Sequence, residues 1–226
     1  MTLVSNDGKM TVPNKSMVPQ QNKKKLKILA VSDTHHDTRI IRELAEKAEQ
    51  EDVDLVILCG DFTHFGKDPE NKIGPFVARG KKVLFIPGNH EDDAICDFFS
   101  EAYQVKNIHG KYVVYSDVGI FASGKAYAVG PNTISEEETF KLLQESHEKI
   151  KHLRKKVMVT HNHPAGTAMA ALSNIVHGSK AVRRAIEEFQ PDVLLCGHVH
   201  EAEGIEEMIG KTRVVNVAKS GRIIEV

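Results

Sequence analysis

The sequence contains no tryptophan and only four tyrosines, so the aromatic side chains on which single-stranded nucleic acids stack are scarce. Basic and acidic residues nearly balance, and the formal net charge is -1. No basic field favours nucleic acid as a partner, and no excess of acidic residues predicts a disordered chain. Both absences argue against a nuclease.

Cysteine is also scarce: Cys59, Cys96 and Cys196 are widely spaced and form no CxxC pair. This spacing argues against a thiolate zinc site, and we expect buried, reduced cysteines. No stretch approaches the roughly 18 apolar residues of a membrane helix, and the N-terminus lacks the apolar run of a signal peptide. We therefore expect a cytoplasmic protein without membrane contact.

Residues 1–25 are polar, end in a lysine cluster and show no apolar periodicity. This composition predicts a flexible N-terminal tail followed by one domain over residues 26–226. The lysines could contact an anionic partner, but a solvated tail explains them more simply. Met10 and Met17 leave the true start open.

From residue 27 onward, short apolar runs alternate with stretches of helical periodicity. The apolar runs predict buried strands at residues 28–31, 53–59, 83–86, 157–159 and 193–196. Helical spacing predicts helices near residues 40–48, 73–79, 95–102, 135–154 and 182–189. We also expect a hairpin at residues 112–122 and closing β-structure at residues 204–226. This alternation predicts a largely parallel sheet.

The five apolar runs end in side chains that bind metal ions well. The endings are Asp33-Thr34-His35, Gly60-Asp61, Gly88-Asn89-His90, His161 and Gly197-His198-Val199-His200. Because ligands bind at the carboxyl ends of parallel strands, these residues should converge on one edge of the sheet. Each motif alone is common, but all five in order, each at the end of a strand, are a specific signal.

Apart from His90, the set comprises two aspartates, one asparagine and four histidines. Such nitrogen and oxygen ligands suit Mn²⁺, Fe or Zn²⁺, with Mg²⁺, Co²⁺ and Ni²⁺ as alternatives. The ligands are too many for one tetrahedral ion, and a carboxylate can bridge two ions. Two ions about 3.5–4 Å apart form a clamp for in-line displacement at phosphorus. The sequence therefore predicts a dinuclear metal centre.

The ordered set resembles the motifs of calcineurin-like metallophosphoesterases: Asp-x-His, Gly-Asp, Gly-Asn-His-Asp/Glu, His and Gly-His-x-His. The resemblance covers about residues 27–220. Residues 178–201 resemble, more loosely, the small single-domain prokaryotic members, including those similar to cyclic-nucleotide phosphodiesterases. The resemblance implies an α/β fold, a four-layer α/β/β/α sandwich of two mixed sheets.

The same resemblance implies a role for each matched residue. It implies two sets of metal ligands: Asp33, His35 and His200 for one ion, and Asn89, His161 and His198 for the other. Asp61 would bridge the two ions, and Glu91 would support the ligands. His90 would lie beside the substrate phosphate as a general acid or a charge partner. A hydroxide bridging the two ions would then attack phosphorus opposite the leaving alcohol.

Two stretches depart from a common form of the family. His161 is followed by Asn162-His163-Pro164-Ala165 rather than Pro-Pro, and residues 216–221 replace an Asn-Pro-Gly-Ser turn. Both changes affect the expected rim of the substrate site. Among the other histidines, we expect His64 and His163 to line the site. The sequence favours this position less for His36 than for the other two. Four further histidines are expected at the surface: His109, His147, His152 and His177.

We therefore expect an enzyme that hydrolyses a small phosphate ester, with a phosphodiester favoured over a phosphomonoester. A non-catalytic, metal-binding scaffold for a protein partner is one alternative, but the presence of four site histidines argues against it: His90, His161, His198 and His200. A nuclease is another alternative, disfavoured by the composition described above. The choice of ester, the metals in the cell and the oligomeric state (monomer or small homo-oligomer) stay open.

Overall fold

The computed structural model of the 226-residue chain describes residues 24–67, 69–127, 130–173 and 175–226. Most of the predicted tail, residues 1–23, lies outside the described residues. Lys24 is exposed and its Nζ lies 3.0 Å from Asp54 Oδ1. The backbone N–H of Leu26 donates to the carbonyl of Val226. The pairing between the first and last strands of the chain therefore begins at Leu26.

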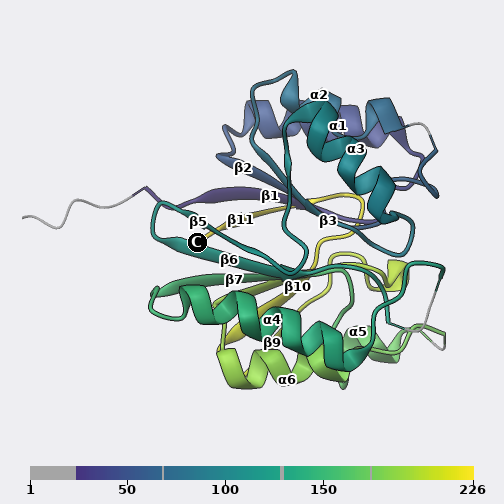
Figure 1. Ribbon diagram of the computed structural model, residues 1–226. Coiled ribbons are helices and arrows are strands. Elements are labelled where there is room, and N and C mark those ends of the chain that lie inside the picture. The colour runs from purple at the N-terminus through teal and green to yellow at the C-terminus, as the bar shows by residue number, and fades with distance from the viewer. Residues whose placement is uncertain (1–23, 68, 128–129, 174) are drawn as a thin grey trace, which may run out of the picture.

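Two sheets face each other across the middle of the molecule (Figure 1). The first has the order β11-β1-β2-β3-β4. Its strands are β1 (Lys27–Val31), β2 (Leu55–Cys59), β3 (Val83–Ile86), β4 (Lys106–Asn107) and β11 (Arg222–Glu225). Strands β1 to β4 are parallel, and β11 pairs antiparallel with β1.

The second sheet has the order β5-β6-β7-β8-β10-β9. Its strands are β5 (Tyr112–Tyr115), β6 (Val118–Ser123), β7 (Lys155–Thr160), β8 (Val193–Cys196), β9 (Glu206–Ile209) and β10 (Thr212–Asn216). Strands β6, β7, β8 and β10 are parallel, and both edge strands are antiparallel. The hairpin expected at residues 112–122 is therefore confirmed as β5 and β6.

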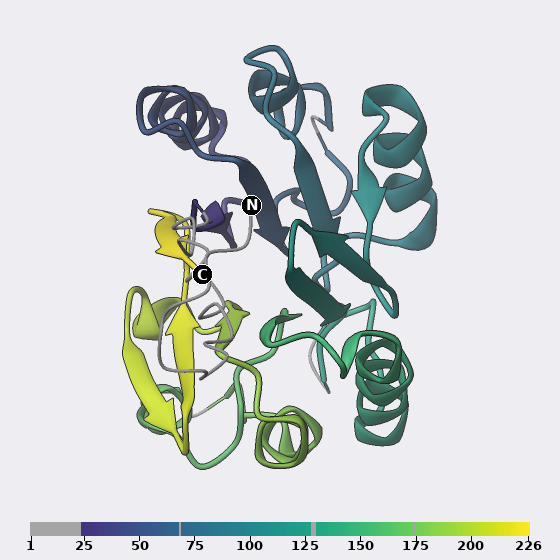
Figure 2. The same cartoon turned by 90° about the vertical axis from the view of Figure 1, so that its left-hand side faces the viewer.

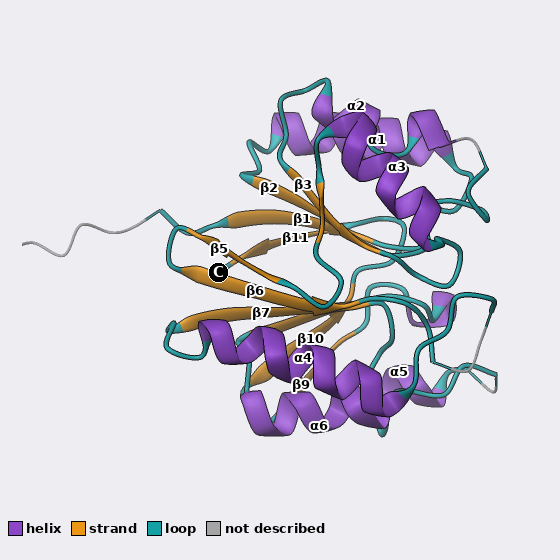
Figure 3. Ribbon diagram, in the orientation of Figure 1, coloured by secondary structure: helices purple, strands orange, loops and turns teal. Residues whose placement is uncertain are grey.

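Helices cover the outer face of each sheet, as Figures 2 and 3 show. Over the first sheet lie α1 (Thr38–Gln50), α2 (Gly74–Val77) and α3 (Asp93–Tyr103). Over the second lie α4 (Glu136–Ile150), α5 (Ala168–Ala171) and α6 (Lys180–Phe189), and two short 3₁₀ turns complete the elements: η1 (Pro69–Asn71) and η2 (His200–Ala202). The predicted four-layer sandwich of two mixed sheets is confirmed.

Three apolar clusters stabilise these layers. One lies between the two sheets, one lies between the first sheet and its helices, and one lies between the second sheet and its helices. All three cysteines are free and buried, as expected. Among the described residues, no helix combines the length and apolar character needed to cross a bilayer.

His147 in α4 and His109 between β4 and β5 differ from expectation. His147 is buried, and its ring stacks on Phe189 with centroids 4.5 Å apart, so the predicted surface position is wrong. The physical reason is that His147 lies on the apolar face of α4, against Phe121. His109 is only partly exposed, and its Nδ1 accepts a hydrogen bond from Gly124 N. His152 and His177 are exposed, as predicted.

The buried His147 makes stability depend on pH. Burial lowers the pKa of His147 in the folded protein, whereas an unfolded histidine has a pKa of about 6.5. The unfolded state therefore takes up protons first, so stability is complete above about pH 6.5 and falls as the pH falls. His147→Leu should weaken this acid dependence, measured by urea unfolding at about pH 7.5 and pH 5.5. Exposed His152→Leu is the control. If the free energy of unfolding changes equally between the two pH values in His147→Leu and wild type, His147 is not the source of the acid dependence.

Candidate metal centre

The five predicted motifs meet at the carboxyl ends of β1, β2, β3, β7 and β8. Asp33, Asp61 and His198 follow their strands with positive φ angles of 56°, 52° and 72°, so the backbone turns sharply at each of them. Gly60 and Gly88 allow the turns to approach each other: a Cβ at Gly88 would overlap the Asp61 carboxylate. The sharp turns aim the side chains of these residues at one edge of the molecule.

Asp33, His35 and His200 form the first group of side chains that could hold a metal ion. His200 Nε2 lies 3.4 Å from Asp33 Oδ1 and 3.3 Å from His35 Nε2. Asp33 is buried, whereas the His200 side chain is exposed. The group is therefore open to solvent on the side of His200.

Asp61, His161 and His198 form a second, fully buried group. His161 Nε2 lies 3.4 Å from Asp61 Oδ2. His161 Nδ1 donates to the Cys59 carbonyl at 2.9 Å, which leaves Nε2 as the nitrogen that can bind a metal. The backbone N–H of His198 donates to Asp33 Oδ2 at 2.9 Å, so a carboxylate of the first group directly supports the second.

Buried polar atoms without a hydrogen-bond partner concentrate among the predicted ligands. They include Asp33 Oδ1, Asn89 Oδ1, His161 Nε2 and His198 Nε2. Because buried polar groups in native proteins are nearly always paired, such a cluster needs an explanation. Divalent cations would satisfy all four atoms, and the nitrogen and oxygen donors suit Mn²⁺, Fe or Zn²⁺. The residues present therefore fit the metal ions that the sequence predicts.

Burial and neighbouring charges shift the pKa values of the second group. Burial lowers the pKa of His198 to about 3, so this imidazole is neutral and able to bind a cation. Burial also opposes the charged form of His161, but the charge of Asp61 outweighs it and raises the pKa of His161 to about 9. Burial likewise opposes ionisation of Asp61, yet the charge of His161 lowers its pKa. Metal binding at this group should therefore release a proton from His161.

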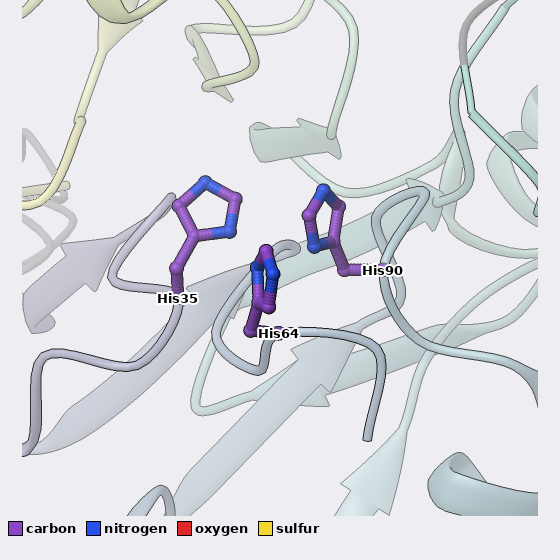
Figure 4. A group of neighbouring side chains, drawn as sticks. All are labelled: His35, His64 and His90. Atoms are coloured by element: carbon purple, nitrogen blue, oxygen red, sulfur yellow. The ribbon is translucent and has the colours of Figure 1, made fainter. Parts of the chain in front are cut away.

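His90 and His64 lie beside the first group, next to His35. Figure 4 shows His35, His64 and His90 pointing toward one another, and their ring nitrogens form a third close group. His90 Nε2 lies 3.9 Å from Asp61 Oδ2, and the His90 backbone N–H donates to Asp61 Oδ1. The ring of His36 lies 5.9 Å from that of His64. The structure thus brings His64 beside the predicted centre.

His163 takes a different position. It is fully buried, neither of its ring nitrogens has a hydrogen-bond partner, and burial lowers its pKa to about 4. The charge of His161 adds to this lowering of the pKa, so His163 lies near the second group rather than on an exposed rim.

Two contacts at the site were not foreseen from the sequence. Asn132 Nδ2 donates to the Asn89 carbonyl, and Phe65 stacks on His90. No motif or periodicity marks either of them, because both depend on how loops fold back over the strand ends.

Glu91 holds the loops around Asp61 together. Its buried carboxylate accepts from Asp61 N at 2.9 Å, Thr63 N at 2.8 Å, Thr63 Oγ1 at 2.7 Å and Gly88 N at 2.9 Å. Burial and the charge of Asp61 raise the pKa of Glu91 to about 7, against the effect of these donors. The predicted supporting role is therefore consistent with its contacts.

Replacing Glu91 should affect both stability and metal binding. Glu91→Gln removes the charge and turns an NH₂ group toward buried donors. We therefore expect the free energy of unfolding to fall by roughly 3 kcal/mol. Metal affinity should fall about 10- to 100-fold, because the support of Asp61 is lost. Urea unfolding and metal titration measure the two effects, and exposed Glu201→Gln is the matched control. Unchanged metal affinity would contradict the supporting role.

A cavity of about 350 Å³ adjoins the first group. Its lining includes Asp33, His35 and His200, together with His36 and Lys219. A larger cavity of about 530 Å³ lies at the opposite ends of β2 and β3, and none of the predicted ligands line it. Of these two cavities, the smaller one is therefore the one that borders the predicted centre.

Comparisons with known proteins agree with this geometry. The sequence profile of the calcineurin-like phosphoesterase family matches residues 26–202. The chain is 32% identical over 206 residues to the uncharacterized protein MJ1162 of Methanocaldococcus jannaschii, covering 85% of this chain and 88% of that protein.

Solved structures share the fold at low sequence identity. TT1561 of Thermus thermophilus superposes with a TM-score of 0.72 and 16% identity, covering 87% of this chain and 91% of that one. A dimetal phosphatase from Danio rerio superposes with a TM-score of 0.60 and 11% identity, covering 86% of this chain and 88% of that one. GAP50, an anchor in the inner membrane complex of Plasmodium, superposes with a TM-score of 0.58 and 9% identity, covering 86% of this chain and 71% of that one.

Proposed function

The chain belongs to the calcineurin-like phosphoesterase family, and we propose that it hydrolyses small phosphate esters with two divalent metal ions. The observation that carries this proposal is the adjacency of two ligand groups in which Asp33 Oδ1, Asn89 Oδ1, His161 Nε2 and His198 Nε2 are buried without a hydrogen-bond partner. Asp33, His35 and His200 would hold one ion, and Asn89, His161 and His198 the other. Asp61, a member of the second group, would contact both ions.

The bound ions would supply positive charge at the phosphoryl group and an activated water as the nucleophile. The protein's own groups would complete the site. Asp61 accepts the His90 N–H through one oxygen and approaches His161 through the other, which fixes its carboxylate between the loops. The His90 imidazole would donate an N–H to charge that develops on the phosphate or leaving oxygen. His64 would border the same space.

We further propose that phosphodiesters are preferred. The cavity beside Asp33, His35 and His200 offers space for a second alcohol group next to the phosphorus. Manganese is the first metal to test among Mn²⁺, Fe and Zn²⁺. The buried, free cysteines support the proposal of a reducing, cytoplasmic location.

The proposal is tested by offering metal-stripped protein bis-p-nitrophenyl phosphate and p-nitrophenyl phosphate, each with and without added Mn²⁺. We expect metal-dependent hydrolysis of the diester. Hydrolysis of the monoester alone would make the protein a phosphatase. Hydrolysis of neither by protein that binds two ions would favour the scaffold hypothesis, since one protein of this fold, the Plasmodium anchor, is named for anchoring.

A further inference from the structure

Phe65 combines two unfavourable features in one residue. Its φ angle is 54°, in the left-handed region that a bulky aromatic residue rarely adopts. Its side chain is also 51% exposed, although the chain buries most of its phenylalanines. Backbone strain of this kind persists only where the surrounding structure enforces it, and it concentrates at functional sites.

The surrounding loop is held in place by the network below it. Thr63 Oγ1 donates to Glu91 Oε1 at 2.7 Å and accepts from Gly66 N at 3.2 Å. A short bridge between His64 and Lys67 closes the turn on the other side. The carboxylate that supports Asp61 therefore also fixes the loop that carries Phe65.

The strained conformation places the Phe65 ring flat on His90. The ring centroids are 4.0 Å apart and the planes differ by only 17°. The other rings around His90 meet it at steeper angles: His35 at 4.6 Å and 62°, and His64 at 5.2 Å and 48°. The buried Nδ1 of His90 has no hydrogen-bond partner. Among these three rings, Phe65 is the one that lies flat against the His90 imidazole.

We propose that Phe65 is a positioning residue, which holds the His90 imidazole in the orientation that meets the phosphoryl group. The proposal rests on the hydrolase function proposed above. The backbone strain and the exposure of Phe65 are then consequences of this role, because a relaxed loop would leave the His90 ring free to turn. The alternative is that Phe65 merely covers the loop and contributes to stability alone.

Phe65→Gly separates these two roles, because glycine adopts a positive φ without strain. In protein loaded with metal, we expect an unchanged or higher melting temperature, two bound ions, and a KM within about twofold of wild type. We expect kcat to fall about 10- to 100-fold, the scale of losing support for a site group. Phe65→Tyr keeps the ring and should restore kcat. Phe98→Ala, which removes another exposed aromatic side chain away from the centre, is the control.

A second readout does not require activity. In the Zn²⁺-loaded protein, the stacked Phe65 ring should shift the His90 carbon-bound ring protons, and NMR should show this shift lost in Phe65→Gly and kept in Phe65→Tyr. If wild type hydrolyses no ester, the hydrolase proposal fails, and this NMR comparison still decides whether Phe65 orients His90. Wild-type kcat or unchanged His90 signals in Phe65→Gly would overturn the proposal.

Discussion

Asp61→Asn should remove metal binding and hydrolysis together. Asp61 is buried, one of its oxygens lies 3.4 Å from His161 Nε2, and the other accepts from His90 N. Asparagine has nearly the same shape but no charge, so it would not offset two cations in a buried site. We expect fewer than two ions per chain and a fall in kcat of at least about 10³-fold, because a preorganised charge is lost.

The measurement is the metal content after equilibration with Mn²⁺, together with the rate of ester hydrolysis. Asp192→Asn is the matched control, since this aspartate binds Lys156 N at the opposite ends of the strands. We expect the control to keep both ions and wild-type activity. An Asp61→Asn protein with two ions and normal turnover would remove Asp61 from the centre.

His90→Ala should separate metal binding from turnover. His90 belongs to neither predicted ligand set, and its ring lies 4.6 Å from that of His35, with 13% of its side chain exposed. We therefore expect two bound ions with near-normal affinity. Loss of a positioned acid or N–H donor should lower kcat about 10²- to 10⁴-fold.

The test compares kcat, KM and metal content of His90→Ala with those of exposed His152→Ala, in which turnover should be unchanged. Unchanged turnover of the preferred ester in His90→Ala would eliminate the role proposed for this residue. Loss of metal instead would show that His90 is itself a ligand.

The convergence of the ligands could be predicted because it depends on local features. Each motif directly follows a buried apolar run, and parallel strands carry their carboxyl ends to a common edge. Strand order could not be derived in this way. The pairing of β11 with β1 and the pairing of β10 with β8 are contacts between segments separated in the sequence, which no local pattern encodes. The two-sheet arrangement came from the family resemblance.

Helical periodicity could have predicted the burial of His147 but not the contact between Phe65 and His90. Phe140, Leu143 and Ile150 are spaced so that position 147 falls on the same face of α4, so the sequence did contain a signal for burial of His147. Phe65 is different. Its contact with His90 depends on a left-handed backbone angle and on the hydrogen bonds that Thr63 Oγ1 donates to Glu91 and accepts from Gly66 N, neither of which leaves a pattern in the sequence.

The most direct test of the dinuclear centre is a stepwise titration of metal-free protein with Mn²⁺, in which bound metal and ester hydrolysis are followed in the same samples. The two adjacent ligand groups predict that binding saturates at two ions per chain and that full activity appears only with the second. Full activity at one ion per chain, or without metal, would contradict the account.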